Sequence, residues 1–333
     1  MEVTMEKIER GKALKTGRDY EDIKFRRKVF MSKCVKKAMS LFRIVTLIGI
    51  SYIVLSPMIS IISRAFFSES DVYNAMVYLI PQNGTLKNFK LAILRMDYWK
   101  TLGYSLLYIG SLAILQLFIC SMVGYGFARF QFPFKKLLFG CVILTIVIPS
   151  YTIMLPLYMH FRNFDPLHLF GLLGIGAKNW LTTVKPVYLM TILGCGLRSG
   201  LFIYIFIQFF RGIPKELEEA AFVDGAGAFR TYFTIMLPNA VPSLITVTVF
   251  SLVWQYNDSF YSGLFGIKSD YLISVKLASL TGTINSLDQI VNPEIQQAYL
   301  DAGIVLMVVP IVIIYIILQR KFIEGVERSG IVG

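Results

Sequence analysis

The chain has 333 residues, of which 55% are hydrophobic and 16% are charged. Soluble domains carry about 25% charged residues, so this composition excludes an ordinary soluble protein and predicts a polytopic membrane protein, whose solvent is lipid. The formal net charge is +12, but no nucleic-acid-binding motif accompanies it, so we expect no nucleic acid among its partners.

Residues 1–40 form a basic N-terminal tail directly ahead of the first apolar run. A basic segment in that place is the positive-inside signature, so we expect the tail to lie in the cytoplasm, where it also suits anionic membrane lipids. A cleaved signal peptide is disfavoured, because the basic region and the apolar run are both too long and no small-residue cleavage site follows.

Six apolar runs are long enough to cross the hydrocarbon as helices, which takes roughly 20 residues each. The predicted spans cover about residues 41–62, 102–127, 137–159, 187–210, 238–256 and 298–318. The sequence therefore predicts an all-α, multi-pass membrane protein with its transmembrane domain over residues 41–318.

Charges between the spans predict their orientation. The link between the second and third spans contains Arg129, Lys135 and Lys136 and no acid, which predicts a cytoplasmic loop. The C-terminal tail, residues 319–333, begins Gln319-Arg320-Lys321 and is expected on the same side. The links after the first and fifth spans are long and polar and are expected outside. Both termini in the cytoplasm require an even number of spans, and six satisfies this.

Several predicted spans contain proline: Pro57, Pro149, Pro156, Pro242 and Pro310. Each proline frees backbone carbonyls that need other partners. Two interpretations are equally open for each: a kink beside a solute path, or simply the general frequency of proline in membrane helices. Gly196 and Gly200 suit close helix packing. The scattered cysteines and the two histidines, His160 and His168, lack ligand spacing, so no metal site is expected.

Residues 211–237, between the fourth and fifth spans, have the pattern of a short helix that begins with proline and ends with glycine. Pro214 stands at a first helical position, where its missing N–H costs nothing. Glu216, Glu218 and Glu219 follow in the first turns, where the helix dipole favours negative charge. Gly225 predicts the end of the helix, because glycine tolerates a left-handed turn.

A second short helix is expected from about Ala228 to Met236, with Pro238 opening the fifth span. In the first helix Ala220 and Ala221 leave a shallow face that another protein could approach closely. The apolar side chains of this segment need cover, and they are Phe222, Phe229, Tyr232 and Phe233. The residues alone leave two interpretations open, a docking site for a partner and an amphipathic helix on the membrane surface.

The same segment resembles the cytoplasmic loop of ABC importer permeases, E-A-A, three residues, G, nine residues, I-x-L-P. The matching residues are Glu219, Ala220, Ala221, Gly225, Ile235, Leu237 and Pro238. The added Asp224-Gly225-Ala226 and the W-x-x-N-D element of residues 254–258 resemble the carbohydrate-uptake branch, and the layout resembles its smaller, maltose-type inner-membrane subunit. The long basic tail is similar to that of permeases for complex, uronate-type oligosaccharides. The resemblance covers about Phe42 to Gly325.

The resemblance implies a role for each part of this loop. The helix of residues 214–223 would be a coupling helix that docks in a groove of a separate ATPase subunit, where Glu219 would meet a basic residue. Asp224 and Gly225 would form the turn, and Pro238 would connect the loop to the fifth span. ATP binding would then rock the spans between inward-facing and outward-facing states.

The resemblance also implies the partners and the location. They are a second, homologous permease subunit, two ATPase subunits, an extracytoplasmic solute-binding protein and a sugar or oligosaccharide, at the bacterial inner membrane. A nucleotide site in this chain would need the G-x-x-x-x-G-K-[ST] loop. The segment Gly171–Lys178 comes nearest, but its lysine is displaced and no Ser or Thr follows. We therefore expect a non-catalytic chain without a cofactor, with ATP and magnesium bound by the ATPase.

Sugars are held by polar groups and aromatic faces. We therefore choose polar and aromatic residues as candidates for the solute path. The candidates are Trp254, Gln255, Tyr256, Asn257, Asp258, Tyr151 and Tyr204. Anchoring at the membrane interface is an equal alternative for each aromatic residue, and Asp301, at a span end, is expected to be solvated there. Two further alternatives stay open for the chain: import of another solute, such as an amino acid or a polyamine, and a membrane scaffold without transport.

Overall fold

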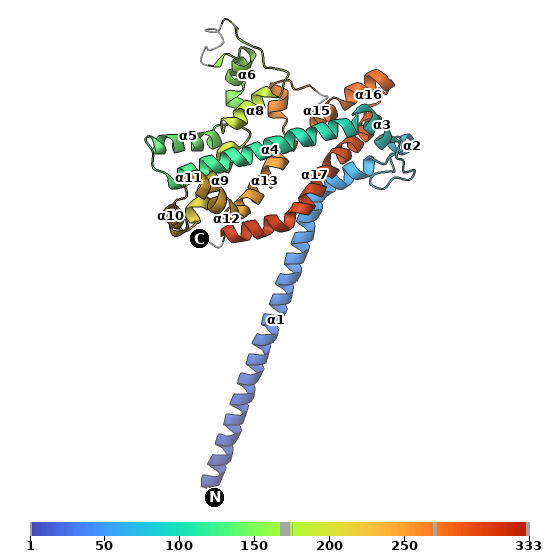
Figure 1. Cartoon of the computed structure of the whole chain (residues 1–333). Helices are drawn as coiled ribbons and strands as arrows, with labels where there is room; N and C mark the ends of the chain where they lie inside the picture. Colours follow the sequence, from blue (N-terminus) through green and yellow to red (C-terminus); the bar gives the residue numbers. More distant parts are fainter. Residues whose placement is uncertain (1, 167–173, 175, 269–271, 331–333) are drawn as a thin grey trace. The chain divides into compact units, whose positions relative to one another are not determined.

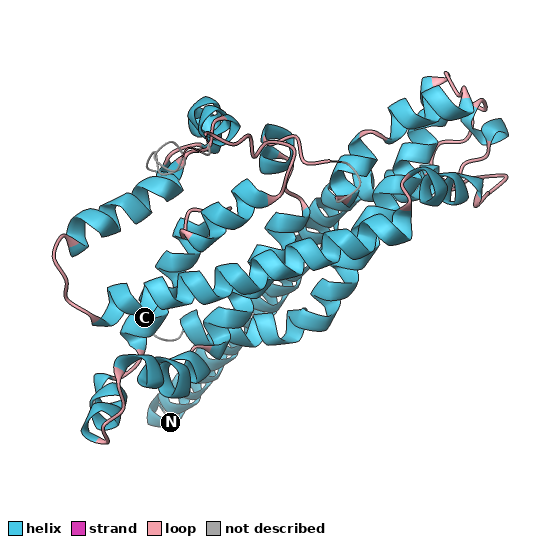
Figure 2. Cartoon of the chain, turned by 45° about the horizontal axis from the view of Figure 1, so that its top comes forward, coloured by secondary structure: helices cyan, strands magenta, loops and turns pink. Residues whose placement is uncertain are grey.

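The computed structural model describes residues 2–166, 174, 176–268 and 272–330. The chain divides into two units, residues 1–60 and 61–333, which are described separately. Within the described residues the regular structure is helical, apart from one isolated antiparallel bridge between Phe164 and Lys178. Figures 1 and 2 show this helical architecture, which confirms the all-α prediction.

The first unit consists of helix α1 (Glu2–Arg64), whose last turn belongs to the second unit. The predicted boundary at residue 40 is therefore not a break, because the basic tail and the first apolar run form one helix. Pro57 lies inside it and cannot donate to the carbonyl of Ile53. The Ser56 hydroxyl donates to that carbonyl instead, at 3.4 Å, so the helix continues past the proline.

The second unit is organised around α4 (Tyr98–Arg129), which packs against α9 (Ser199–Gly212) and α13 (Val241–Tyr256). α13 in turn packs against α17 (Pro293–Gly330). Figure 2 shows these long helices side by side. Gly124 allows the contact between α4 and α9, because a Cβ atom there would overlap Phe206. A buried cluster rich in phenylalanine fills the space around this crossing.

Two of the predicted spans are broken rather than straight. α5 (Lys135–Val147) and the following 3₁₀ turn with α6 (Met154–Arg162) are bent by 104° at Pro149. α8 (Lys185–Ile192) ends before α9 begins, so the fourth predicted span is also two helices. The shorter helices are α2 (Glu69–Val72), α3 (Lys87–Arg95), α10 (Lys215–Val223), α11 (Ala228–Thr231), α12 (Leu237–Asn239), α14 (Phe260–Leu264), α15 (Ile273–Ala278) and α16 (Leu280–Asp288).

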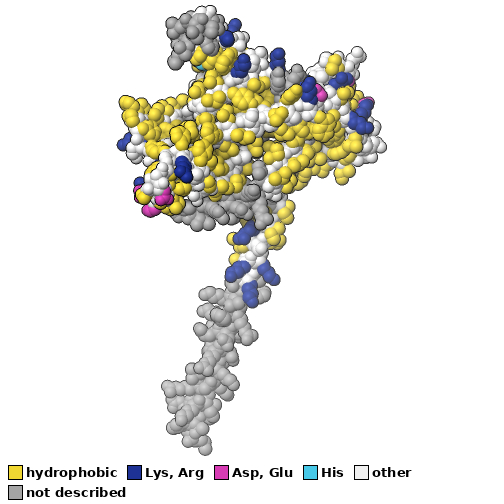
Figure 3. All heavy atoms as spheres, in the orientation of Figure 1, with side chains coloured by type: hydrophobic (Ala, Val, Ile, Leu, Met, Phe, Trp, Pro, Cys, Tyr) yellow, Lys and Arg dark blue, Asp and Glu magenta, His cyan; other side chains and the backbone are white. Residues whose placement is uncertain are grey.

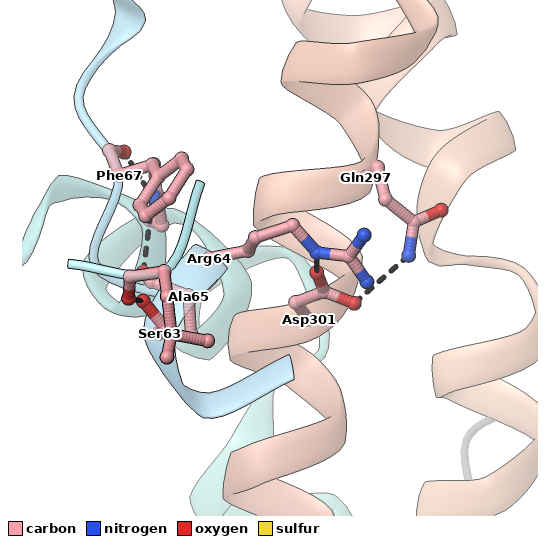
Figure 4. Close-up of polar contacts among 8 residues, drawn as sticks. Ser63, Arg64, Ala65, Phe67, Gln297 and Asp301 are labelled. Carbon is pink, nitrogen blue, oxygen red and sulfur yellow. Dashed lines mark hydrogen bonds and ion pairs between the residues drawn. The ribbon is translucent and has the colours of Figure 1, made fainter. Parts of the chain in front are cut away.

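Ion pairs fasten the end of the second unit where α3, α16 and the start of α17 meet. The Arg95 Nε donates to Asp288 Oδ2 at 2.8 Å, which joins α3 to α16. The Arg95 guanidinium holds the pKa of the Asp288 carboxyl below its usual value. In Figure 4 the Arg64 guanidinium points at the Asp301 carboxylate, with Nε 2.8 Å from Oδ2, and Gln297 donates to the other oxygen.

Asp301 is fully buried. The expectation that it is solvated at the interface is therefore wrong. A buried carboxylate needs a partner, and Arg64 supplies it from the last turn of α1.

Three helices in the described part of the chain are long and apolar enough to cross a membrane, Val35–Arg64, Tyr98–Arg129 and Pro293–Ile317, and they match the first, second and sixth predicted spans. The count rises to five if each bent pair is one span, and Ser199–Gly212 is apolar but shorter. Figure 3 shows hydrophobic side chains over most of the visible face of the second unit, with charged side chains toward its edges. Several apolar helices are confirmed, and the number six stays a prediction.

Candidate functional site

Helix α10 (Lys215–Val223) is the short helix that the sequence predicts, and its ending is fixed by Gly225. Asp224 is the C-cap residue, and Gly225 follows in the left-handed region with φ 78°. The Gly225 N–H donates to Phe222 O at 3.0 Å, and the Ala226 N–H donates to Ala221 O at 2.9 Å. This pair of bonds is the Schellman motif, so the chain reverses here at a defined angle.

The exposed face of α10 contains only one of the two alanines that the sequence analysis expects there. Leu217, Ala220 and Asp224 are exposed, and Glu219 beside them is exposed too. Ala221 is buried, with 6% exposure, so the expectation that both alanines face a partner is wrong for Ala221. The helical period explains the difference, because a residue one position from Ala220 is rotated by about 100°.

The inner face of α10 is clamped to the end of α4 by Glu218. The Tyr125 hydroxyl donates to Glu218 Oε1 at 2.5 Å, and Arg129 Nε lies 3.2 Å from Glu218 Oε2. Arg129 Nη2 also donates to the carbonyl of Ile213 at 2.6 Å, just ahead of α10. The side chains of Arg129 and Glu218 are only 5% and 8% exposed. Buried charges of opposite sign with further hydrogen bonds hold a defined geometry, so α10 is fixed to α4.

The segment after α10 is not the one short helix that the sequence predicts from about Ala228 to Met236. α11 (Ala228–Thr231) leads into a π-helical turn (Tyr232–Met236) and then into α12 (Leu237–Asn239). The segment Ala228–Asn239 meets α13 at a bend of 78°. Pro238 therefore lies within α12 and does not open the fifth span.

Two missing donors explain the turn and the bend. Pro238 cannot donate to the carbonyl of Thr234, and Pro242 cannot donate to the carbonyl of Pro238. The Asn239 side chain donates to Ile235 O at 2.7 Å, which satisfies a carbonyl near the bend.

Aromatic residues in this region are divided between a buried and an exposed set. Tyr232 is buried, its ring lies 5.3 Å from that of Tyr125, and its hydroxyl is 2.6 Å from Ser121 Oγ. Phe222 and Phe229 remain 42% and 72% exposed. The chain therefore covers Tyr232 itself and leaves an apolar surface around α10 and α11.

The predicted path residues on α13 point in three directions. Trp254 packs toward α9, with its ring 5.5 Å from that of Phe202. Gln255 is buried and donates to Gln116 Oε1 of α4 at 3.4 Å. The Tyr256 hydroxyl donates to Met307 O of α17 at 2.6 Å. Consecutive helix residues are rotated by about 100°, so the structure does not bring these three together.

The remaining candidates lie beyond the end of α13 and on other helices. Asn257 is exposed. Asp258 accepts from the backbone N–H groups of Tyr261 and Ser262, both at 3.2 Å. Burial raises the pKa of the Asp258 carboxyl, and these backbone hydrogen bonds oppose that shift.

The two candidate tyrosines occupy different places. Tyr151 is exposed and lines a cavity of about 530 Å³ between the end of α5 and the start of α9. Tyr204 lies on α9, with its ring 6.5 Å from that of Phe139. It is not among the residues that line this cavity.

No cluster of three or more metal-ligating side chains occurs among the residues described by the structure. His160 packs its ring edge-on against Phe161 and Phe164. His168 and half of the segment Gly171–Lys178 lie outside the described residues.

Residues 117–328 match the family model described as "Binding-protein-dependent transport system inner membrane component". The chain belongs to this family. It is thus a non-catalytic inner-membrane permease component of an importer that works with a solute-binding protein. The matched residues include the whole loop from α10 to α12.

Three curated relatives align with most of the chain. The arabinooligosaccharides transport permease protein of Halalkalibacterium halodurans is 29% identical over 85% of this chain and 93% of its own. The diacetylchitobiose uptake permease protein of Streptomyces coelicolor is 26% identical over 84% of each chain. The trehalose transport permease protein of Mycobacterium tuberculosis is 27% identical over 77% of this chain and 85% of its own.

A solved structure has the same fold. It is the crystal structure of a bacterial ABC transporter involved in the import of the acidic polysaccharide alginate. One of its chains aligns with a TM-score of 0.67 at 20% identity, over 86% of this chain and 97% of that one.

Sequence reasoning missed the residues that attach α10 to α4. It also missed those that hold the break between α8 and α9 in place. Glu218 was noted only for its place near the helix N-terminus, and Arg129 only as a cytoplasmic charge. The available signal was their chemistry at predicted helix ends, since an acid and a base there can pair. Gln116, a polar residue inside an apolar run, was a second signal that was not used.

Proposed function

We propose that this permease is one of two homologous subunits that form the transmembrane path of an ATP-driven importer for a sugar or oligosaccharide. The observation that carries the proposal is the agreement among relatives that align with 77–85% of the chain, whose names all refer to sugar or oligosaccharide transport. The exposed ring of Tyr151, which lines the cavity between α5 and α9, is consistent with such a solute.

The proposed coupling site is the exposed face of α10. Glu219 is exposed beside Leu217 and Ala220, and it would pair with a basic side chain in a groove of a separate ATPase subunit. Gly225 would keep the turn, and Asp224 would cap it. Pro238 would set the bend through which α10 acts on α13.

The proposed topology has six spans with both termini in the cytoplasm of the bacterial cell. The bent pair at Pro149 would then be the third span and α8 with α9 the fourth, each interrupted, and α13 would be the main part of the fifth. The basic segment at residues 1–40 and the basic loop after α4 support this orientation. ATP and magnesium would be held by two ATPase subunits, and the solute would be delivered by an extracytoplasmic solute-binding protein.

The test is solute uptake by cells that carry the whole transporter. Glu219→Lys reverses the exposed charge, and Gly225→Pro cannot adopt φ 78°; we expect both variants to reach the membrane and to lose uptake. Glu294→Gln, an exposed acid at the start of α17, is the matched control and should retain uptake. Normal uptake by both loop variants would refute the coupling role, and uptake of an amino acid or a polyamine with no glycan uptake would refute the substrate class.

A further inference from the structure

The cavity between α5 and α9 lies where two helices stop. α5 ends at Val147, and α9 begins at Ser199. The two helices pack closely, because a Cβ atom on Gly200 would overlap Thr145 Oγ1. The residues around the cavity belong to the last turn of α5, the bend at Pro149 and the segment before α9, and Tyr151 and Tyr261 line it as well.

Neither helix is long enough to cross the hydrocarbon. α5 has 13 residues and α9 has 14, which gives each a length of about 20 Å against roughly 30 Å of hydrocarbon. Their other ends meet the basic loop after α4 and the loop that carries α10. With those other ends at the cytoplasmic edge of the membrane, as in the proposed topology, the irregular backbone beyond Val147 and before Ser199 would lie at membrane depth. Such backbone is tolerated only where protein buries it or where it lines a water-filled cavity.

A hydrogen-bond network holds the break before α9 in place. Gln116 of α4 donates to the carbonyl of Leu197 at 2.6 Å and to Ser199 Oγ at 2.8 Å. The Ser251 hydroxyl donates to Gln116 Oε1 at 2.7 Å. These bonds fix the residues on both sides of Arg198, which itself has a left-handed backbone with φ 57°. A non-glycine residue in that region is uncommon and persists where the surroundings determine it.

Arg198 lines this cavity and is exposed. Its guanidinium carbon lies 5.5 Å from the centroid of the Trp254 ring. No carboxylate of the described residues lies within 4.0 Å of it, whereas Asp258 is engaged with the backbone of α14. A cation at membrane depth is costly and marks a solute or ion path.

We propose that Arg198 binds an acidic group of the transported carbohydrate, so that this cavity is a solute subsite for a carboxylate-bearing oligosaccharide. A guanidinium matches a carboxylate in a planar, two-bond geometry, and the exposed ring of Tyr151 offers an aromatic face for a sugar ring. Trp254 holds the guanidinium from the side of α13. The inference rests on the proposed function and names the substrate class of the same path.

The experiment compares uptake of trigalacturonate and maltotriose, which carry carboxylates and no charge respectively, by the whole transporter. Three variants are measured with the wild type. Arg198→Gln removes the charge, Arg198→Lys retains it, and Arg162→Gln removes an exposed cation at the end of α6 as the matched control.

We expect the wild type to take up the acidic trisaccharide, and Arg198→Gln to lose about tenfold or more of that uptake, the effect of losing a charge-assisted hydrogen bond. Arg198→Lys should retain part of it, and Arg162→Gln should match the wild type. Uptake of maltotriose alone would overturn the inference and leave the proposed function standing. Unchanged trigalacturonate uptake in Arg198→Gln would overturn it too, and uptake of neither sugar would count against both proposals.

Discussion

The ion pair between Arg129 and Glu218 makes a quantitative prediction about coupling. Glu218→Ala leaves the Arg129 guanidinium, 5% exposed, without its carboxylate and leaves the Tyr125 hydroxyl without its acceptor. Breaking a buried ion pair by removing one partner costs about 3–5 kcal/mol. Since about 1.4 kcal/mol is a tenfold change in an equilibrium constant, the attachment of α10 to α4 should weaken by roughly two to three and a half orders of magnitude.

The assay is the number of solute molecules imported per ATP hydrolysed in proteoliposomes that contain the whole transporter. If α10 must move with α4, its release lets the ATPases turn over without rocking the spans, so this ratio should fall while ATP hydrolysis persists. A purely structural role would lower uptake and hydrolysis together with the amount of folded protein.

Two further variants separate charge from geometry. Arg129→Lys keeps the charge but loses the planar fork that reaches both Glu218 and the Ile213 carbonyl, so it should be intermediate. The double variant Arg129→Glu with Glu218→Arg restores opposite charges and should recover part of the ratio. An unchanged ratio in Glu218→Ala, at wild-type amounts of protein, would refute the reasoning.

Three other predictions concern stability. Gln116→Leu removes the donor of the part-buried Leu197 carbonyl and the buried partner of Ser199 and Ser251. It should therefore destabilise the protein by about 1–3 kcal/mol, measured as a lower midpoint of thermal unfolding, whereas an unchanged midpoint would contradict the network. Gly225→Ala meets no atom within 4 Å but must adopt φ 78°, so a cost of about 1–2 kcal/mol should appear as faster hydrogen exchange in α10, and unaltered exchange would argue against the turn. The pKa of Asp288 is lowered by Arg95, so its contribution to stability is present above the ordinary carboxyl pKa and is lost as the pH falls through the lower folded pKa. Asp288→Asn should remove this loss of stability at acid pH, so a plot of the unfolding midpoint against pH should be flatter there than for the wild type. An unaltered plot would contradict the ion pair.

The helical architecture and the loop could be predicted because their signals are local. Apolar runs of span length and a proline-to-glycine helix of nine residues, α10, are visible in the chain itself. The glycine at 225 also predicted where this helix ends, and its left-handed φ confirms that reasoning.

The interruptions of the spans could not be located as well, because apolar periodicity does not distinguish a straight helix from a bent one. Pro57 and Pro310 lie inside continuous helices, whereas Pro149 stands at a bend of 104°. The difference depends on what replaces the missing hydrogen bond, and the Ser56 hydroxyl at Ile53 is such a replacement. That information lies in packing and in neighbouring side chains.

The contacts of the candidate sites depend on residues far apart in the chain. Glu218 meets Tyr125 of α4, 93 positions earlier in the chain, and Gln255 meets Gln116, 139 positions earlier. A list of polar and aromatic residues could name Trp254 and Tyr151. It could not show that Arg198 lies against the Trp254 ring and lines the same cavity as Tyr151, because the break before α9 places it there.

The most direct measurement of the central claim is ATP-dependent accumulation of a labelled oligosaccharide in proteoliposomes. These contain this permease with its partner permease, ATPase subunits and solute-binding protein. We predict accumulation that requires ATP and is abolished by Glu219→Lys while the ATPases remain able to hydrolyse ATP in detergent. Equal accumulation without ATP, or full accumulation by the Glu219→Lys transporter, would contradict the account of α10 as the site through which ATP hydrolysis drives transport.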